Sequence, residues 1–292
     1  MTEQAPVQRR PVAVVVATKD RPAFLADCLA SIAADVRTDD ELVVAEAGNS
    51  DAAVALACLD RKTVHVELHA GGKSRQLNAA VARCLAPIIL FTDDDCRIQA
   101  GWADAMTAPF EDDPAVAIAF GPVVGLSHHP GSTPMAGPPP GEAPLATWTF
   151  AHGAAMAVRR SALSAIGGFD ERLGPGAPAH GEEHDVLLRL RERGYRAVVA
   201  PAPTVEHLDW LDEEQNLANV MVYQRGSGAF LGAALRRAPR ATWPLLKLRL
   251  SFQREIFGGG RVKDWEFGAR ALAGFGRGFL YGLRLRPGGA AR

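Results

Sequence analysis

Residues 86–98 read APIILFTDDDCRI, an apolar run that ends in three consecutive aspartates, Asp93, Asp94 and Asp95. The apolar run is typical of a strand that is buried on both faces of a parallel sheet. The three carboxylates repel one another, and nothing local in the sequence offsets them. Paired carboxylates after a buried strand suit a hard divalent cation such as Mg²⁺ or Mn²⁺, although a solvated acidic turn has the same composition.

Similar apolar runs occur earlier in the chain and alternate with segments of helical apolar spacing. Hydrophobic residues make up 48% of the 292 residues, which supports a packed core and excludes a disordered chain. Strands and helices that alternate at roughly 30-residue intervals predict a mostly parallel sheet flanked by helices. The expected strands lie within residues 11–18, 40–46, 63–68 and 86–95, and the expected helices within residues 23–35, 51–59 and 71–85.

Polar residues follow three of these expected strands at the point where each strand ends. Thr18, Lys19 and Asp20 follow the first strand, Glu46 the second, and the three aspartates the fourth. In open parallel sheets, ligands bind beyond the carboxyl ends of the strands. Loop solvation alone explains one polar strand end, but three such ends among four expected strands predict a common site.

A long segment rich in proline and glycine, Val123–Ala146, separates this pattern from the second half of the chain. It is expected to form no regular structure and to be long enough for an active-site flap. His128 and His129 within it are interpreted as exposed loop residues.

The second half predicts a helix with an acidic start at Glu182 and an end at Gly194, followed by a strand that leads to His207. Amphipathic helical segments follow. The sequence therefore predicts two parts, a catalytic α/β domain over residues 1–209 and a basic helical extension over residues 210–292.

Charge is distributed unevenly between these parts. Residues 236–292 contain 13 Lys/Arg and 3 Asp/Glu, whereas the remaining residues contain 19 and 30. A basic tail on an acidic body indicates an anionic partner such as a membrane surface, although a solvated helical face has the same composition. Aromatic residues interleave with the basic residues, which favours a membrane surface, and the acidic body argues against nucleic acid. They are Trp265, Phe267, Phe275, Phe279 and Tyr281.

Four scattered cysteines, a polar N-terminus and the lack of a long apolar run predict a cytoplasmic protein, including peripheral attachment at the inner face of the plasma membrane.

Seven short motifs together resemble family 2 glycosyltransferases, the large group of inverting enzymes with the Rossmann-like GT-A fold. Each motif alone is weak, but all seven occur in the order typical of the family. They are VVVATKDRP (14–22), VVAEAGNSD (43–51), GGKSRQLNAAV (71–81), FTDDDCRIQAGW (91–102), GGFDERL (167–173), GEEHDVLLRLRERGYR (181–196) and VEH (205–207).

The resemblance implies a metal-dependent enzyme that moves a hexosyl or deoxyhexosyl group from a UDP-, GDP- or dTDP-linked donor to an acceptor hydroxyl. The acceptor is expected to be a glycan or lipid-linked, as in polysaccharide, glycolipid or cell-envelope glycan assembly. The donor-binding residues implied are Thr18, Asp20 and Arg21 at the base and ribose, Glu46 at the nucleobase, and Lys73 and Arg75 at the diphosphate.

For the metal, the resemblance implies the DxD pair Asp93 and Asp95 together with His207. The register of the pair is open by one residue, so Asp93 and Asp94 are also candidate donor-binding residues. Glu183 takes the position of the general base, with Glu182 and Asp185 as alternatives. Glu-for-Asp changes at Glu46 and Glu183 depart from the usual pattern.

A segment similar to YQRGSGAF (223–230) occurs in some relatives after the catalytic domain. Arg225, Gly226 and Gly228 are therefore candidates for the acceptor side, with helix packing as the equal alternative. Two other functions are possible alternatives. One is a sugar nucleotidyltransferase, although the Gly-rich loop typical of those enzymes is absent from this sequence. The other is a non-catalytic or natural-product-directed glycosyltransferase homologue. No nucleic-acid partner is expected.

Overall fold

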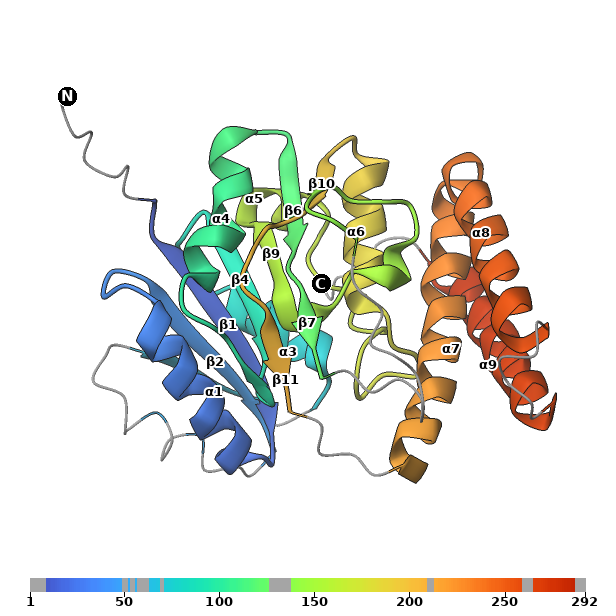
Figure 1. Ribbon diagram of the computed structural model, residues 1–292, viewed down its shortest axis with the longest axis horizontal. Helices are drawn as coiled ribbons and strands as arrows, with labels where there is room; N and C mark the ends of the chain where they lie inside the picture. The colour runs from blue at the N-terminus through green and yellow to red at the C-terminus, as the bar shows by residue number, and fades with distance from the viewer. Residues whose placement is uncertain are drawn as a thin grey trace.

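The central sheet confirms the predicted mostly parallel α/β architecture. The computed structural model describes residues 9–48, 52, 56, 63–68, 71–125, 138–208, 213–258 and 265–286. Eight strands lie in the order β3-β2-β1-β4-β9-β6-β10-β8, and β3, β2, β1 and β4 run parallel (Figure 1). These strands are β1 (Val12–Lys19), β2 (Glu41–Ala47), β3 (Thr63–Leu68), β4 (Ile88–Asp93), β6 (Val116–Phe120), β8 (Gly141–Glu142), β9 (Met156–Arg159) and β10 (Arg196–Val199).

β1 shows why the sheet needs continuous apolar runs. Val12, Val14 and Val16 lie in one buried cluster, and Ala13 and Val15 lie in another. Successive side chains of a strand point to opposite faces of the sheet. Because helices cover both faces, neither set of side chains can be polar, as the sequence pattern predicted.

Helices cover the two faces of the sheet in two groups. Apolar residues of α1 and α4 belong to one core cluster, and those of α3, α5 and α6 belong to the other. The expected helix over residues 51–59 lies almost wholly outside the described residues. The helices are α1 (Pro22–Asp35), α3 (Lys73–Val81), α4 (Trp102–Asp112), α5 (Arg160–Ala165) and α6 (Glu182–Glu192), with the short 3₁₀ helices η1 (Thr147–Thr149) and η2 (Gly153–Ala155).

A second, three-stranded sheet in the order β5-β11-β7 joins distant parts of the chain. It consists of β5 (Cys96–Arg97), β7 (Val123–Val124) and β11 (Val205–His207). The prediction that residues 123–146 form no regular structure was therefore wrong in two places, because β7 and β8 both pair with other strands. Short strands of two residues carry too little periodicity to be recognised in a sequence. His128 and His129 lie outside the described residues.

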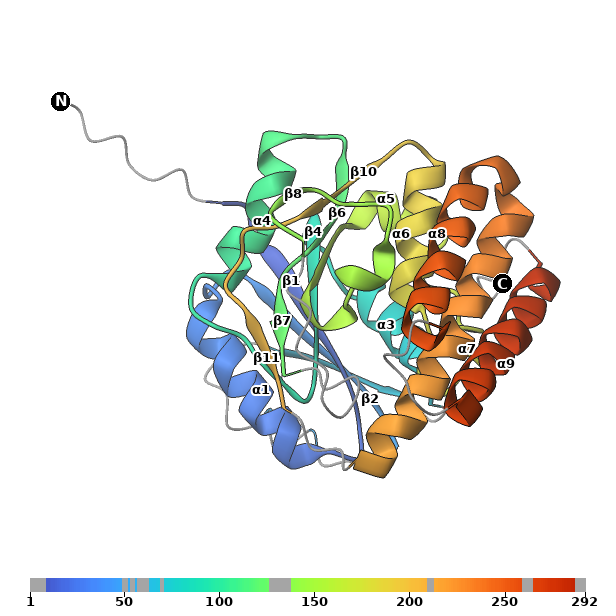
Figure 2. The same cartoon turned by 45° about the vertical axis from the view of Figure 1, so that its right-hand side comes forward.

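Three long helices follow the sheets and confirm the predicted helical extension: α7 (Glu213–Arg237), α8 (Pro239–Gly258) and α9 (Trp265–Arg284) (Figure 2). α7 packs against α6, and α8 and α9 pack against α7. The predicted division at residue 209 falls on residues outside the described ranges and stays a prediction.

Glycines let α7 and α9 approach until their backbones touch. A Cβ atom on Gly228 would lie 2.0 Å from the carbonyl oxygen of Phe275, and one on Gly282 would lie 2.0 Å from that of Ala229. Any larger residue would push the helices apart. Gly228, a candidate for the acceptor side, therefore packs against α9, and α7 continues through it without a break.

Candidate active site

The carboxyl ends of β1, β2 and β4 bring the three predicted polar strand ends together. In the sheet register, Thr18 lies opposite Glu46 and Ala17 lies opposite Asp93. The strands are parallel neighbours, so their ends meet at one edge of the sheet.

The three aspartates, which have no local counter-charge, receive cations from two distant segments. Arg21, between β1 and α1, contacts Asp94 at 2.6 Å and Asp95 at 2.8 Å. Lys73, at the start of α3, places Nζ 2.5 Å from Asp93 Oδ1. The Thr18 hydroxyl donates a hydrogen bond to Asp94 Oδ2 at 2.8 Å. Tertiary contacts therefore offset the repulsion that the sequence leaves open.

These contacts have different effects on the protonation of the aspartates. Burial raises the pKa of Asp94 to about 6, because the opposing effects of Arg21 and Thr18 do not cancel the loss of solvent. For Asp93, burial is outweighed by the charge of Lys73, which holds the pKa below its ordinary value. For Lys73, burial is likewise outweighed, and the carboxylates of Asp93 and Glu182 raise the pKa of the amine.

His207 reaches the aspartates through the small sheet, where it lies opposite Cys96. Its Nε2 atom is 3.5 Å from Asp95 Oδ1. The ligand-bearing atoms of Asp95, Cys96 and His207 all lie within 4.8 Å of one another. Burial, together with the charge of Asp93, raises the pKa of the Cys96 thiol, so the carboxylate and the imidazole are the available ligands. An oxygen and a nitrogen ligand fit Mn²⁺.

Glu182 and Glu183 begin α6 directly after Gly181, whose φ of +102° only glycine adopts readily. Glu182 Oε1 lies 3.9 Å from Lys73 Nζ. Both glutamates line a small pocket with Lys73 and Asp93. The pocket is lined by Lys73, Leu77, Phe91, Thr92, Asp93, Gly153, Met156, Phe169, Glu182 and Glu183.

Both glutamates bind protons more tightly than an exposed carboxyl group. Burial, and then the neighbouring charge of Glu183, raise the pKa of Glu182 to about 7. Burial also raises the pKa of Glu183, although the Lys73 charge works against it. Carboxyl groups with raised pKa values in a pocket are typical of proton-transfer sites.

Three predicted donor-binding residues contact residues other than the aspartates and the glutamates of the site. Glu46 Oε2 forms a hydrogen bond of 2.6 Å with His65 Nε2. Arg75 pairs with Glu171 at 3.2 Å. Asp20 lies against Gly48, where an added Cβ would be 2.5 Å from Asp20 Oδ1. Asp20 and Glu46 still lie at the carboxyl edge of the sheet, whereas Arg75 points to the surface.

Two residues that shape the site are not among those predicted from the sequence. Gln76 is buried and donates hydrogen bonds to the carbonyl oxygens of Thr18 and Ala45, which ties α3 to two strand ends. Tyr223 of α7 lies edge-on to His180, with ring centroids 6.0 Å apart. Only the Tyr-x-x-Gly segment of the sequence pointed towards Tyr223.

Gly226 brings α7 up to the loop before α6. A Cβ atom on Gly226 would lie 2.9 Å from the His180 carbonyl oxygen. This close approach explains why Tyr223, one turn earlier on the helix, lies against His180.

A protein-family comparison matches residues 13–167, more than half of the chain, to the model described as glycosyl transferase family 2. The chain belongs to this family. The matched range contains the strand ends that carry Thr18, Glu46 and the three aspartates, and the start of α3 with Lys73.

Known relatives agree with this assignment. The chain is 27% identical over 209 residues to the pre-mycofactocin glycosyltransferase of Mycobacterium tuberculosis, an alignment that covers 68% of this chain and 40% of the relative. The chain thus matches less than half of the length of that curated relative.

Solved structures show the same fold. A mannosyltransferase from Pyrobaculum calidifontis, solved in complex with GDP-Man and Mn²⁺, superposes with a TM-score of 0.62 at 16% identity, covering 96% of this chain and 88% of that one. Glucosyl-3-phosphoglycerate synthase from Mycobacterium tuberculosis, solved with Mn²⁺, UDP and phosphoglyceric acid, gives 0.53 at 17% identity, covering 74% and 76%. The GT-A fold predicted from the sequence is confirmed.

Proposed function

We propose that this glycosyltransferase is a metal-dependent, inverting enzyme that moves a sugar from a nucleotide-diphosphate donor to an acceptor hydroxyl. One observation carries the proposal. Lys73 contacts Asp93 at the strand end and also lies 3.9 Å from Glu182 at the helix start. A single side chain therefore joins the acidic edge that suits a cation and a diphosphate to the carboxyl pair that suits proton transfer.

The donor is proposed to lie along the carboxyl edge of β1, β2 and β4. Thr18, Asp20, Arg21 and Glu46 would contact the base and ribose, and Lys73 would lie near the diphosphate. Arg21 and Lys73 already bind oxygen anions of the aspartates, and the same donors suit phosphate oxygens. Arg75 is a weaker candidate for the diphosphate, since its side chain pairs with Glu171 at the surface.

Asp95 and His207, together with Asp93, are the residues that would hold Mn²⁺ or Mg²⁺. When bound, the ion supplies positive charge where the leaving diphosphate develops negative charge. Asp94 faces Thr18 and Arg21, which favours a donor-binding and positioning role for it. The Mn²⁺ in the two related structures supports the same choice of metal.

Glu183 is proposed as the general base, with Glu182 as the alternative. In direct displacement, the acceptor oxygen forms a bond to the anomeric carbon as the bond to the nucleoside diphosphate breaks. The carboxylate takes the proton of the acceptor hydroxyl, and the nucleoside diphosphate leaves with the electrons of the broken bond. The nearby Lys73 charge lowers the pKa of Glu183 against the effect of burial, which helps to keep it ionised.

The acceptor is proposed to approach past α7, where Tyr223 lies against His180, two residues before Glu182. A glycan, glycolipid or cell-envelope acceptor fits an open aromatic edge, since Tyr223 is 48% exposed. A natural-product acceptor is the second candidate, favoured by the similarity to pre-mycofactocin glycosyltransferase. We propose that the protein encounters its nucleotide-sugar donor in the cytoplasm.

Calorimetry with UDP and GDP, with and without Mn²⁺, tests this function. We expect the wild type to bind one nucleotide more tightly with Mn²⁺, and Asp95→Ala to lose that increase. Glu183→Gln is the matched variant: it should keep the Mn²⁺-dependent binding but lower turnover of the corresponding nucleotide-sugar at least about 10²-fold.

Two outcomes would contradict parts of the proposal. Undiminished nucleotide affinity of Asp95→Ala with and without Mn²⁺ would remove Asp95 from the metal site. A fully active Glu183→Gln beside an inactive Glu182→Gln would move the base by one residue.

A further inference from the structure

α8 and α9 each carry three exposed basic residues that recur every seven positions. They are Arg240, Lys247 and Arg254 on α8, and Arg270, Arg277 and Arg284 on α9. Seven residues make about two helical turns, so each set of three forms one stripe along its helix. None of the six forms an ion pair with another described residue, which leaves their charges directed to solvent. We call these six residues the basic stripes.

Large apolar side chains lie exposed between the basic residues. On α8, Trp243 is 52% exposed and Leu250 47%, at the third and tenth positions after Arg240. On α9, Leu280 is 57% exposed, three positions after Arg277. The Nζ atom of Lys247 lies 5.5 Å from the centre of the Trp243 ring, so cation and aromatic ring share one patch.

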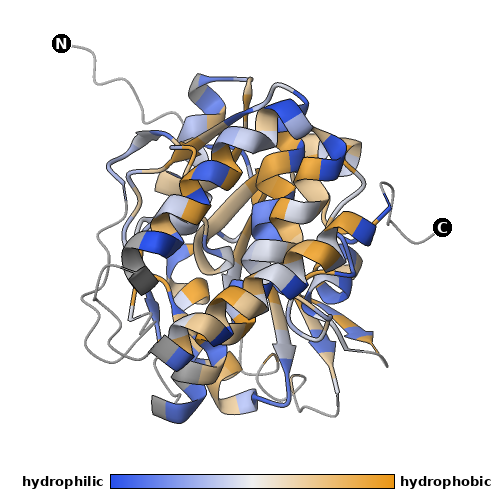
Figure 3. Ribbon diagram, turned by 90° about the vertical axis from the view of Figure 1, so that its right-hand side faces the viewer, coloured by the Kyte–Doolittle hydropathy of each residue, from blue (hydrophilic) through white to orange (hydrophobic). Residues whose placement is uncertain are grey.

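The opposite sides of the two helices already hold them on the protein. Leu245 and Leu246 of α8 and Phe275 of α9 are buried in one cluster with Phe230 of α7. The exposed stripes are therefore not needed for packing within the described chain. Figure 3 views the molecule from this side, where hydrophilic and hydrophobic residues alternate along the helices that face the reader.

The outward set of apolar residues differs from the set expected from the sequence. Phe275 is buried, Phe279 packs against the same cluster, and the Tyr281 hydroxyl donates a hydrogen bond to the Arg172 carbonyl oxygen. The side chain of Trp265 lies outside the described residues. Trp243, Leu250 and Leu280 take the place of these aromatic residues on the outer face.

Acidic residues are few in the sequence of this region. The only ones after Arg236 are Glu255, Asp264 and Glu266. The rest of both helices presents cations and apolar side chains without carboxylates between them. This combination attracts an anionic surface and also offers apolar groups that can leave water.

We propose that the outer face of α8 and α9 docks on the surface of an anionic lipid bilayer, with the basic stripes at the headgroups and Trp243, Leu250 and Leu280 at the acyl boundary. Exposed leucines favour a bilayer over nucleic acid, whose phosphates would leave them in water. Among the described helices, none is long and apolar enough to cross a membrane, so the contact is interfacial. Docking of this face does not depend on which donor or general base the active site uses.

Co-sedimentation of the full chain with vesicles tests the proposal. We expect binding to phosphatidylcholine vesicles that contain phosphatidylglycerol, no binding to phosphatidylcholine alone, and weaker binding as salt rises. The triple variant Arg240→Gln, Lys247→Gln, Arg277→Gln should lose affinity roughly a hundredfold, at about fivefold for each basic residue near an anionic surface. Trp243→Ser with Leu280→Ser should weaken binding without changing its salt dependence.

The matched control removes three exposed arginines elsewhere: Arg10→Gln, Arg83→Gln and Arg193→Gln. It changes the net charge equally and should keep nearly all of the affinity. Thermal melting should show that every variant is folded, and nucleotide binding should stay as in the wild type.

Several results would overturn the inference. Equal losses in the control and in the stripe variant would show that only net charge matters. Equal binding to neutral and anionic vesicles would exclude the headgroup contact. Tighter binding to a DNA or RNA oligonucleotide than to vesicles, or a dimer that the stripe variant converts to a monomer, would assign the face to a different partner. A failure of nucleotide binding with intact vesicle binding would concern only the proposed function.

Discussion

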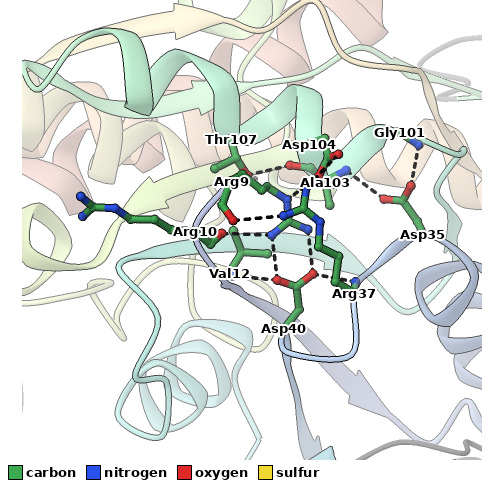
Figure 4. Close-up of polar contacts among 10 residues, drawn as sticks. All are labelled: Arg9, Arg10, Val12, Asp35, Arg37, Asp40, Gly101, Ala103, Asp104 and Thr107. Carbon is green, nitrogen blue, oxygen red and sulfur yellow. Dashed lines mark hydrogen bonds and ion pairs between the residues drawn. The ribbon is translucent and has the colours of Figure 1, made fainter. Parts of the chain in front are cut away.

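The two ends of β1 carry charged clusters with opposite properties. At the amino end, Arg9 and Asp40 form two hydrogen bonds of 2.7 Å, and Val12 donates its N–H to the same carboxylate (Figure 4). At the carboxyl end, Arg21 and Lys73 contact three aspartates that lie next to one another. Both clusters are largely buried, so burial alone does not distinguish them.

The pKa values separate the two ends. Burial tends to raise the pKa of Asp40, but hydrogen bonds from Arg9, Val12 and Arg37 outweigh it and hold the value below 3.8. At the other end, burial prevails, and the pKa values of Asp94 and Glu182 rise to about 6 and about 7. The amino end is therefore a satisfied structural cluster. The carboxyl end keeps an excess of negative charge, which suits a site that binds a cation and moves a proton.

The largest effect on stability is expected from Asp40→Ala. The change leaves the Arg9 guanidinium, 6% exposed, without its main partner and frees the Val12 N–H. Removing one member of a buried ion pair costs about 3 kcal/mol or more, which urea unfolding at neutral pH would measure. Because the folded pKa of Asp40 is lowered, its stabilisation is present at neutral pH and is lost below 3.8, so the difference from the wild type should shrink there.

Nucleotide binding by the folded Asp40→Ala protein should be unchanged, since the cluster lies at the far end of β1. A stability close to that of the wild type would show that the amino-end cluster is not the structural anchor inferred above.

An intermediate effect is expected from Glu182→Gln, measured as the pH dependence of unfolding. The folded pKa of about 7 lies above the ordinary 4.5, so the native state binds the extra proton in this range and the wild type loses stability as the pH rises from 4.5 to 7. The variant should lack this loss, which is at most about 1.4 kcal/mol per pH unit for one proton. If the free energy of unfolding depends on pH in the same way in both proteins, burial does not raise the pKa of Glu182.

The smallest effect is expected from Asp104→Asn. Asp104 pairs with Arg9 and Arg37, but its side chain is 60% exposed. An exposed ion pair contributes less than about 1 kcal/mol, so urea unfolding should change little. A loss as large as that of Asp40→Ala would show that the number of ion pairs, rather than their burial, decides the strength of the amino-end cluster.

Much of the fold and part of the candidate site could be predicted because they depend on local patterns. β4 and its acidic end are formed by consecutive residues, so the sequence shows them directly. A parallel arrangement then places the carboxyl ends of β1, β2 and β4 at the same edge of the sheet. By contrast, β7 and β8 were missed because each has two residues and exists only through pairing with a distant strand.

The contacts of the site residues depend on chain segments that the sequence does not relate. Arg21 and Lys73 were expected near the nucleotide, but nothing in their spacing indicated which aspartate each would contact. Gln76 gave no signal, because its hydrogen bonds go to backbone carbonyl groups of two strands that approach only in the folded sheet.

By itself, the sequence determined the parallel sheet, the order of the motifs and the positions of the acidic strand ends, since periodicity and local charge are properties of neighbouring residues. Only the tertiary structure decided how Asp93, Asp94 and Asp95 divide among Lys73, Arg21 and His207. It also decided that Gly228 packs on α9 and that Trp243, rather than Phe275, faces outward. These outcomes depend on which distant surfaces meet, because burial and charge neutralisation are set by contacts that form only when the helices and strands pack together.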